Sequence, residues 1–139
     1  MSSRTKSRKR ALDALYASEI RKIDAKQLLN ETAAGVSDRQ NQDAIFDYAE
    51  TLVDGVAGNL VQIDSELRLL ADGWSLERMP NVDRCILRLG SWEILHNEDV
   101  PNEVAIAEAV ALAAEYSTDD SPKFVNGVLA RLARGTKAL

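Results

Sequence analysis

The chain has 139 residues, of which 45% are hydrophobic and 28% charged, with a formal net charge of −5, one cysteine and one histidine. This length predicts one domain with its own core, and no apolar run of about 18 residues is present that could cross a membrane. One cysteine excludes an internal disulfide, and one cysteine with one histidine excludes a zinc site built from these residue types alone. We therefore expect a cytoplasmic protein without a metal or other cofactor.

Helical periodicity predicts an all-α fold of about six or seven helices, and no segment alternates as a strand would. The first helix is expected to begin at residues 3–7, and a second to cover residues 24–33, before a polar loop at residues 36–42. The apolar residues of the first helix that are expected to be buried are Ala11, Leu12, Leu15 and Ile20.

An apolar stripe extends from Ile45 to Leu70 in steps of three and four residues, which predicts one helix about 37 Å long. Gly55 and Gly58 lie inside this stripe, where each glycine costs about 1 kcal/mol relative to alanine. The sequence therefore predicts either a closely packed neighbour at these glycines or a break near Gly58.

Turn-forming residues over 73–80 predict a soft internal boundary, which divides the single domain 1–139 into two packed small helical bundles. The two tryptophans, Trp74 and Trp92, are interpreted as packing residues, and Cys85 as a small buried hydrophobe.

The last part of the chain carries clear helix-start signals. Pro101 stands where a first helical position is expected, and Ser121–Pro122 predicts the start of a last helix that ends at Gly135. Between them, the segment Val104–Ala114 has ten apolar residues and only Glu108 as a polar one. A helix that is apolar nearly all round is expected to be buried.

Charge is distributed unevenly along the sequence. Residues 1–10 carry five cations and no acid, residues 121–139 carry four cations and no acid, and all 22 acids lie between them. The three sections therefore carry +5, −14 and +4. Basic segments of this kind are typical of nucleic-acid contact, although a solvated terminus has the same composition.

The most specific motifs lie between Asp83 and Leu129. They read DRCILRLGSWEIL, VPNEVAIAEAVALAAEY and SPKFVNGVL. An N-terminal R-x-x-A-x-x-x-L-Y pattern is formed by Arg8, Ala11, Leu15 and Tyr16. Together these motifs resemble the NusB family of transcription antitermination factors over essentially the whole chain, and KFVNGVL is the most specific of them.

The chain departs from the family pattern INEAVELAK in one helix. Ala107, Ala111 and Ala114 stand where the pattern has Asn, Glu and Lys. This departure puts polar contacts to RNA or a partner at these positions in doubt, and it leaves the apolar signature of the fold unchanged.

The resemblance implies an all-helical protein of two packed three-helix units with no catalytic activity. It implies binding to the boxA element of ribosomal RNA leaders together with NusE, a small-subunit ribosomal protein. The resulting assembly then acts on RNA polymerase to suppress premature termination.

Single-stranded RNA requires cations for its phosphates and flat side chains for its unstacked bases. Lys9 and Tyr16 are two helical turns apart and share a face, while Lys123 and Phe124 place a cation beside an aromatic ring. The resemblance assigns RNA binding to Arg4, Lys6, Arg8, Lys9, Arg10, Tyr16, Lys123 and Phe124. If the first and last helices pack side by side, these residues form one composite RNA surface.

Two alternatives stay open for these residues and for the acidic middle. The terminal cations could be solvated only, and both Tyr16 and Phe124 could be core residues. The resemblance places Asp83 and Asp120 at or near the NusE contact, but Asp120 could equally be only the cap before Pro122. The acidic middle is either a face for a basic partner or a solvated surface.

Two other function classes are compatible with the sequence. One is an accessory domain related to the N-terminal domain of RNA cytosine methyltransferases. The other is a helical scaffold that associates with itself as a homodimer.

Overall fold

The computed structural model describes residues 2–71 and 74–135. These residues form seven α-helices, one short 3-10 helix and no strand, which confirms the all-α prediction. The elements are α1 (Ser3–Arg21), α2 (Ala25–Ala34), η1 (Arg39–Gln42), α3 (Asp43–Gly58), α4 (Leu60–Leu70), α5 (Asn81–His96), α6 (Asn102–Tyr116) and α7 (Ser121–Arg134). No helix among the described residues has the length and apolarity needed to cross a bilayer.

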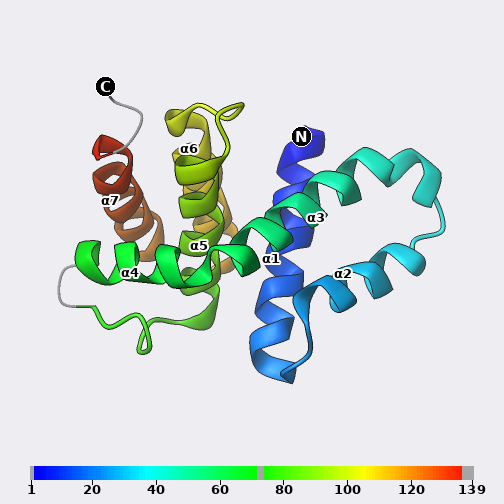
Figure 1. Ribbon diagram of the computed structural model, residues 1–139, viewed down its shortest axis with the longest axis horizontal. Helices are drawn as coiled ribbons and strands as arrows, with labels where there is room; N and C mark the ends of the chain where they lie inside the picture. The colour runs from blue at the N-terminus through cyan, green and yellow to red at the C-terminus, as the bar shows by residue number, and fades with distance from the viewer. Residues whose placement is uncertain (1, 72–73, 136–139) are drawn as a thin grey trace.

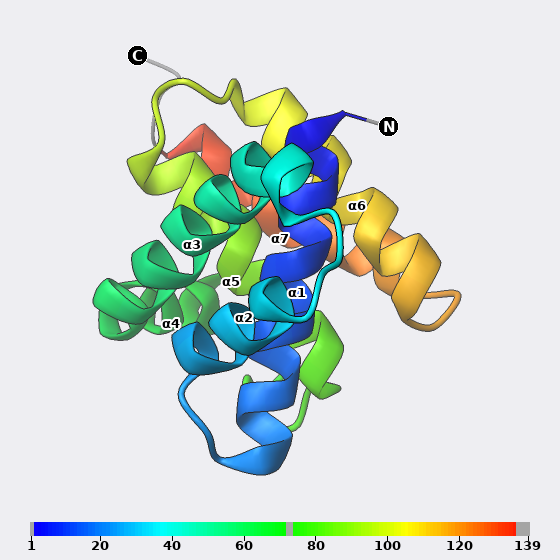
Figure 2. The same ribbon diagram turned by 90° about the vertical axis from the view of Figure 1, so that its right-hand side faces the viewer.

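The helices form two groups that share one core (Figure 1). In the first group α1 packs on α3 and α2, and Figure 2 shows α2 and α3 in front of α1. In the second group α5 packs on α6, α7 and α4. Helix α5 also packs on α1 and α3, so that it joins the two groups. A division of the chain over residues 73–80 stays a prediction, and residues 72, 73 and 136–139, including Lys137, lie outside the described residues.

The long stripe is divided between two helices, which confirms the predicted break near Gly58, so the stripe does not form a single helix about 37 Å long. Helix α3 ends at Gly58, and α4 begins at Leu60 after Asn59, whose side-chain amide donates to the carbonyl of Gly55 at 2.8 Å. The close neighbour expected at a glycine is also present, since a Cβ on Gly55 would lie 2.2 Å from the ring of Trp92. Trp92 is therefore a packing residue, as predicted.

Helix α1 buries Ala11 and Leu12 as expected, but Ile20 is 55% exposed. Ile20 follows Ala11 by nine residues, which places it about 180° around the helix and away from the core. Leu15 is partly buried against the core.

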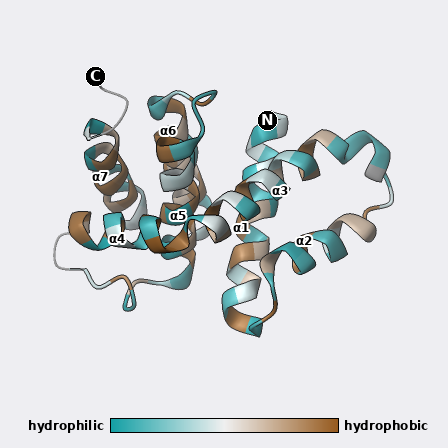
Figure 3. Ribbon diagram, viewed as in Figure 1, coloured by the Kyte–Doolittle hydropathy of each residue, from teal (hydrophilic) through white to brown (hydrophobic). Residues whose placement is uncertain are grey.

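Helix α6 is buried on one side only, so the prediction that it is buried all round is wrong. Figure 3 shows hydrophobic residues along α6 and α7, and α6 packs with α5 and α7 through Ala105, Ala109, Leu112 and Ala113. Its other side is exposed to solvent and consists of Val104, Ala107, Ala111 and Ala114. Small alanine side chains cost little when exposed, so composition alone could not distinguish the two sides. The helix begins at Asn102, one residue after the predicted Pro101.

Candidate nucleic-acid interface

Arg8 is the only one of the five N-terminal cations that is buried; its side chain is 4% exposed. Its guanidinium donates to both carboxylate oxygens of Glu93, at 2.9 and 2.8 Å, and to Glu108 at 2.9 Å. Burial lowers the pKa of Arg8, but hydrogen bonds and charges from Glu93 and Glu108 outweigh this and raise the pKa above its ordinary value. Arg8 thus joins α1 to α5 and α6, and its predicted contact with RNA stays a prediction.

The hydroxyl of Tyr48 on α3 completes this buried cluster. It donates to Glu93 at 2.5 Å and accepts from the side-chain amide of Asn97 at 3.0 Å. Burial and the neighbouring Glu93 both raise the pKa of Tyr48, so its hydroxyl stays protonated and can keep donating. The cluster therefore fixes where the N-terminal turns of α1 lie on the protein surface.

The other N-terminal cations lie at or near the surface around this anchor. Arg4 and Lys6 are exposed, and the guanidinium of Arg4 lies 4.3 Å from the centre of the Tyr48 ring. Arg10 lies 5.2 Å from the centre of the Phe46 ring. Aromatic faces hold guanidinium groups without neutralising their charge, so these cations stay available to an anion.

Three of these cations line a hollow with a volume of about 250 Å³. Lys6, Lys9 and Arg10 surround it together with Tyr116, which is 44% exposed at the end of α6. Its remaining lining residues are Asp13, Gln42 and Ile45. We define these seven residues as the cationic hollow.

Lys9 also forms an ion pair with Glu115 at 2.9 Å, which brings the last turn of α6 to α1. Sequence reasoning missed Tyr116, because only this contact between distant segments places a tyrosine beside the cations. Tyr16 is 43% exposed on the same face of α1 as Lys9, which rules out a core role for Tyr16.

A second concave surface lies at the start of α7, with a volume of about 370 Å³. Trp74 and Phe124 form one part of it, with ring centres 5.9 Å apart and planes tilted by 56°. Trp74 packs on Phe124 as predicted but is 57% exposed, so it is not a core residue, while Phe124 is partly buried against the core. The remaining lining residues are Arg78, Met79, Pro80, Asp83, Thr118, Asp120 and Ser121. We call this surface the aromatic groove.

The two acids predicted to contact the partner differ in burial. Asp83 is 5% exposed, and its carboxylate accepts hydrogen bonds from Ser117 at 2.5 Å and Ser121 at 2.9 Å. Asp120 is exposed, and its side chain makes no capping hydrogen bond at the start of α7. Asp120 nevertheless occupies the N-cap position of α7, and its carbonyl accepts from the amide of Phe124 at 3.3 Å, so both the cap and the partner contact stay open for Asp120, and a partner contact stays a prediction for Asp83.

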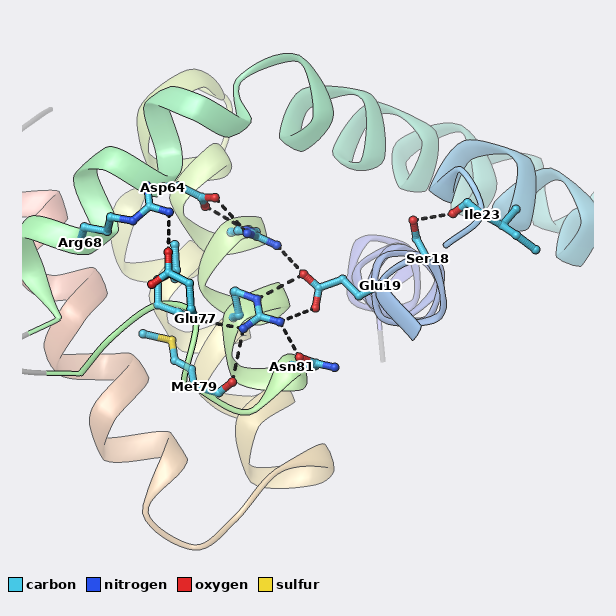
Figure 4. Close-up of polar contacts among 11 residues, drawn as sticks. Ser18, Glu19, Ile23, Asp64, Arg68, Glu77, Met79 and Asn81 are labelled. Atoms are coloured by element: carbon cyan, nitrogen blue, oxygen red, sulfur yellow. Dashed lines mark hydrogen bonds and ion pairs between the residues drawn. The ribbon is translucent and has the colours of Figure 1, made fainter. Parts of the chain in front are cut away.

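A second cluster of charges connects the C-terminal half of α1 to α5 and to one wall of the aromatic groove (Figure 4). Glu19 accepts from Arg84 at 2.7 Å and from Arg88 at 2.7 Å, and Arg88 also donates to Asp64. Burial raises the pKa of Glu19, but the two arginines outweigh burial and hold the pKa below its ordinary value of 4.5. Arg84 donates further to the carbonyl of Met79 at 3.3 Å, so the wall of the aromatic groove is connected to α1.

The first and last helices are not one of the main packed pairs in this fold. Helix α1 packs on α2, α3 and α5, whereas α7 packs on α4, α5 and α6. The condition for one composite RNA surface, that α1 and α7 pack side by side, is therefore not met. Helix α6 connects the two surfaces, because Tyr116 closes the cationic hollow and the chain enters α7 five residues later.

Residues 5–134 match the NusB family. The chain belongs to the NusB family. It is 48% identical to the transcription antitermination protein NusB of Leifsonia xyli subsp. xyli over 134 residues, which cover 96% of this chain and 93% of that protein. It is 47% identical to the protein of the same name from a Nocardioides species, covering 100% and 99% of the two chains. Because these relatives are antitermination proteins, they support the expectation of a non-enzymatic factor.

Solved structures of the family have the same fold. NusB of T. maritima is 36% identical and superimposes with a TM-score of 0.86, covering 96% of this chain and 92% of that one. A structure of the antitermination factors NusB and NusE in complex with double-stranded RNA contains a chain that is 26% identical. That chain superimposes with a TM-score of 0.83, and the coverage is 97% and 98%.

Proposed function

We propose that the protein is an antitermination adaptor that binds boxA RNA of ribosomal RNA leaders together with NusE, in the cytoplasm, and assembles on RNA polymerase. The observation that carries this proposal is the cationic hollow, where three cations meet an exposed tyrosine on a NusB fold. The structural neighbour solved with NusE and RNA supports the same two partners.

The residues of the cationic hollow and their neighbours on α1 have different roles in this proposal. Lys6 and Arg10 contact phosphates, while Tyr16 and Tyr116 offer ring faces to unstacked bases. Arg4, which lies over the Tyr48 ring outside the hollow, adds positive charge to the same end of α1, and Lys9 contributes if it exchanges its ion pair with Glu115 for a phosphate. Arg8 acts indirectly, by holding these residues in place through Glu93.

NusE would meet the acidic part of the surface, because ribosomal proteins are basic. Asp120 is exposed and available for such a contact, and Asp83 supports it by holding Ser117 and Ser121 in position. Opposite charges on two partners increase the rate of association and orient docking. A homodimer stays a prediction that light scattering of the free protein tests.

The deciding experiment measures the affinity of the protein for boxA RNA and for a scrambled RNA of the same length, each with and without NusE. We expect weak binding to boxA alone, tight binding with NusE, and a clear preference for boxA over the scrambled RNA. Equal affinity for the two RNAs would contradict the boxA assignment.

Two variants locate the RNA contact on the surface. Lys6→Ala with Arg10→Ala is expected to weaken binding to boxA. Lys26→Ala removes an exposed cation of α2 that pairs with Glu50 and Asp54, and is expected to leave binding unchanged. An equal loss in both variants would indicate a general effect of net charge.

A further inference from the structure

We propose that the aromatic groove receives one unstacked RNA base that stacks on Trp74 and carries an amino group on its edge. This inference rests on the proposed RNA-binding function and adds Trp74 and Arg78 to the residues that recognise the RNA.

The two rings of the groove are suited to a flat ligand. Trp74 exposes 57% of its surface although its ring already contacts Phe124. Because the two planes are tilted by 56°, the rings do not stack face to face, and the exposed part of the indole is accessible to a ligand. Base stacking on such faces is the usual way in which single-stranded RNA is held.

The polar side of the groove favours a base over a phosphate. The buried carboxylate of Asp83 lines the groove, and the exposed Asp120 adds a second negative charge. These acids repel phosphates but accept hydrogen bonds from the amino group of a base, as acidic side chains do with cytosine. Uracil has no amino group, and its one donor on that edge, the N3–H, lies between two carbonyl oxygens that a carboxylate repels, so we expect adenine, guanine or cytosine to be preferred.

Cations at the edge of the groove complete the site. Arg78 lines the groove, and the exposed Lys123 precedes Phe124 in α7. They can hold the phosphates on either side of the inserted base while the acids contact its edge. This distribution of charge distinguishes an RNA base from an apolar protein side chain.

The wall of the groove is held in place before any ligand arrives. The guanidinium of Arg84 donates to the carbonyls of Leu76, at 2.9 Å, and Met79, at 3.3 Å. The amide of Trp74 donates to the carbonyl of Ala71 at 3.0 Å. Little ordering of this segment is therefore required when the base binds.

Tryptophan fluorescence provides a direct test in the full chain. The protein has two tryptophans, and Trp92 is packed in the core against Gly55, so a change on RNA binding reports Trp74. We expect boxA RNA to quench the fluorescence and Trp74→Phe to remove this quenching. Quenching that persists in Trp74→Phe would overturn the proposal.

Affinity measurements with NusE and boxA RNA test the energetic role of the ring. Trp74→Ala is expected to weaken RNA binding roughly 5- to 100-fold, the range for loss of one stacking aromatic. Trp74→Phe is expected to keep most of the affinity, and Val61→Ala, which truncates an 84% exposed side chain on α4, to keep all of it. Full affinity in Trp74→Ala would overturn the proposal.

A series of RNAs in which each amino-bearing base of boxA is replaced in turn by uracil identifies the inserted base. One replacement is expected to weaken binding to the wild type and to have little further effect on Trp74→Ala, since both changes remove the same contact. Additive losses at every position would contradict the proposal.

Three outcomes separate this proposal from others. If Trp74→Ala weakens the binding of NusE in the absence of RNA and leaves RNA binding unchanged, the groove binds protein and the proposal is wrong. If Trp74→Ala has no effect while the wild type still prefers boxA, the base site is wrong and the proposed function stands. If the wild type does not prefer boxA, the proposed function itself fails.

Discussion

Arg8 and Arg10 are the same residue type, two positions apart on one helix, and yet their surroundings are opposite. The guanidinium of Arg8 is buried between Glu93 and Glu108, whereas Arg10 lies over the Phe46 ring at the edge of an open hollow. One arginine holds α1 in place and the other presents a charge. The difference shows that the formal charge counted along a segment of sequence can exceed the charge that the folded segment presents to solvent, because some of its cations are buried in ion pairs.

The largest effect is expected when the buried arginine is removed. Arg8→Ala leaves Glu93 buried without its cation, which costs about 3–5 kcal/mol in the free energy of unfolding. Arg10→Ala is expected to cost less than about 1 kcal/mol, because its guanidinium lies over a ring at the surface rather than in a buried ion pair. Urea unfolding measures both variants, and equal stabilities would contradict the contrast between them.

The next effect concerns the aromatic residues beside the exposed cations. Tyr116→Ala and Tyr16→Ala are each expected to weaken boxA binding by about 1–3 kcal/mol if each ring stacks on a base. Tyr116→Phe and Tyr16→Phe keep the ring and should bind RNA nearly as well as the wild type. Titrations with labelled RNA measure these affinities, and a loss caused by the phenylalanine variants would show that the hydroxyls matter instead.

In the C-terminal half of α1, the contribution of Glu19 to stability is expected to depend on pH. Because the folded-state pKa of Glu19 is lowered, its contribution to stability is fully present above its ordinary pKa of 4.5 and is lost as pH falls through the folded value. Glu19→Gln is therefore expected to be less stable than wild type by about 1–2 kcal/mol at pH 7. Urea unfolding between pH 7 and pH 3 measures this difference, which should shrink below pH 4.5. A constant difference would mean that the charge of Glu19 is unimportant.

The smallest effect is expected in the salt dependence of RNA binding. Each phosphate contact that is removed reduces the slope of log affinity against log salt by about 0.7. Lys6→Ala and Arg10→Ala should each flatten the slope by this amount, which changes affinity less than about threefold over a fourfold range of salt. Titrations at several salt concentrations give the slopes, and unchanged slopes would show that these cations do not contact phosphates.

The helices themselves were predictable from the sequence, because apolar spacing determines which residues can share a buried face. The positions of α2 and α7 follow from residues such as Gly35 and Pro122, which end or begin helices. Where a local pattern allows two structures, the sequence left the choice between them open. The stripe from Ile45 to Leu70 continues in register across Asn59, so the break there is visible only as two glycines.

The candidate site was predictable only in part, because burial depends on contacts between distant segments. In the sequence, Arg8 cannot be distinguished from the other N-terminal cations. Its burial depends on Glu93 and Glu108, which are about 85 and 100 residues away in the chain. Tyr116 and Trp74 carry no local signal of exposure, since aromatic residues are usually packing residues. Only the contacts of α6 with α1 and of Trp74 with Phe124 place these rings at a surface.

The contact between Gly55 and Trp92 restricts how this protein can evolve. Any side chain at position 55 would overlap the indole ring, so the glycine cannot be replaced while the tryptophan remains. Gly58, one turn later, has room for a methyl group and is free to vary, since no packed neighbour among the described residues would lie within 4 Å of it. Descendants of this chain should therefore change positions 55 and 92 together or leave both alone, which preserves the separation of α3 and α5 through long divergence.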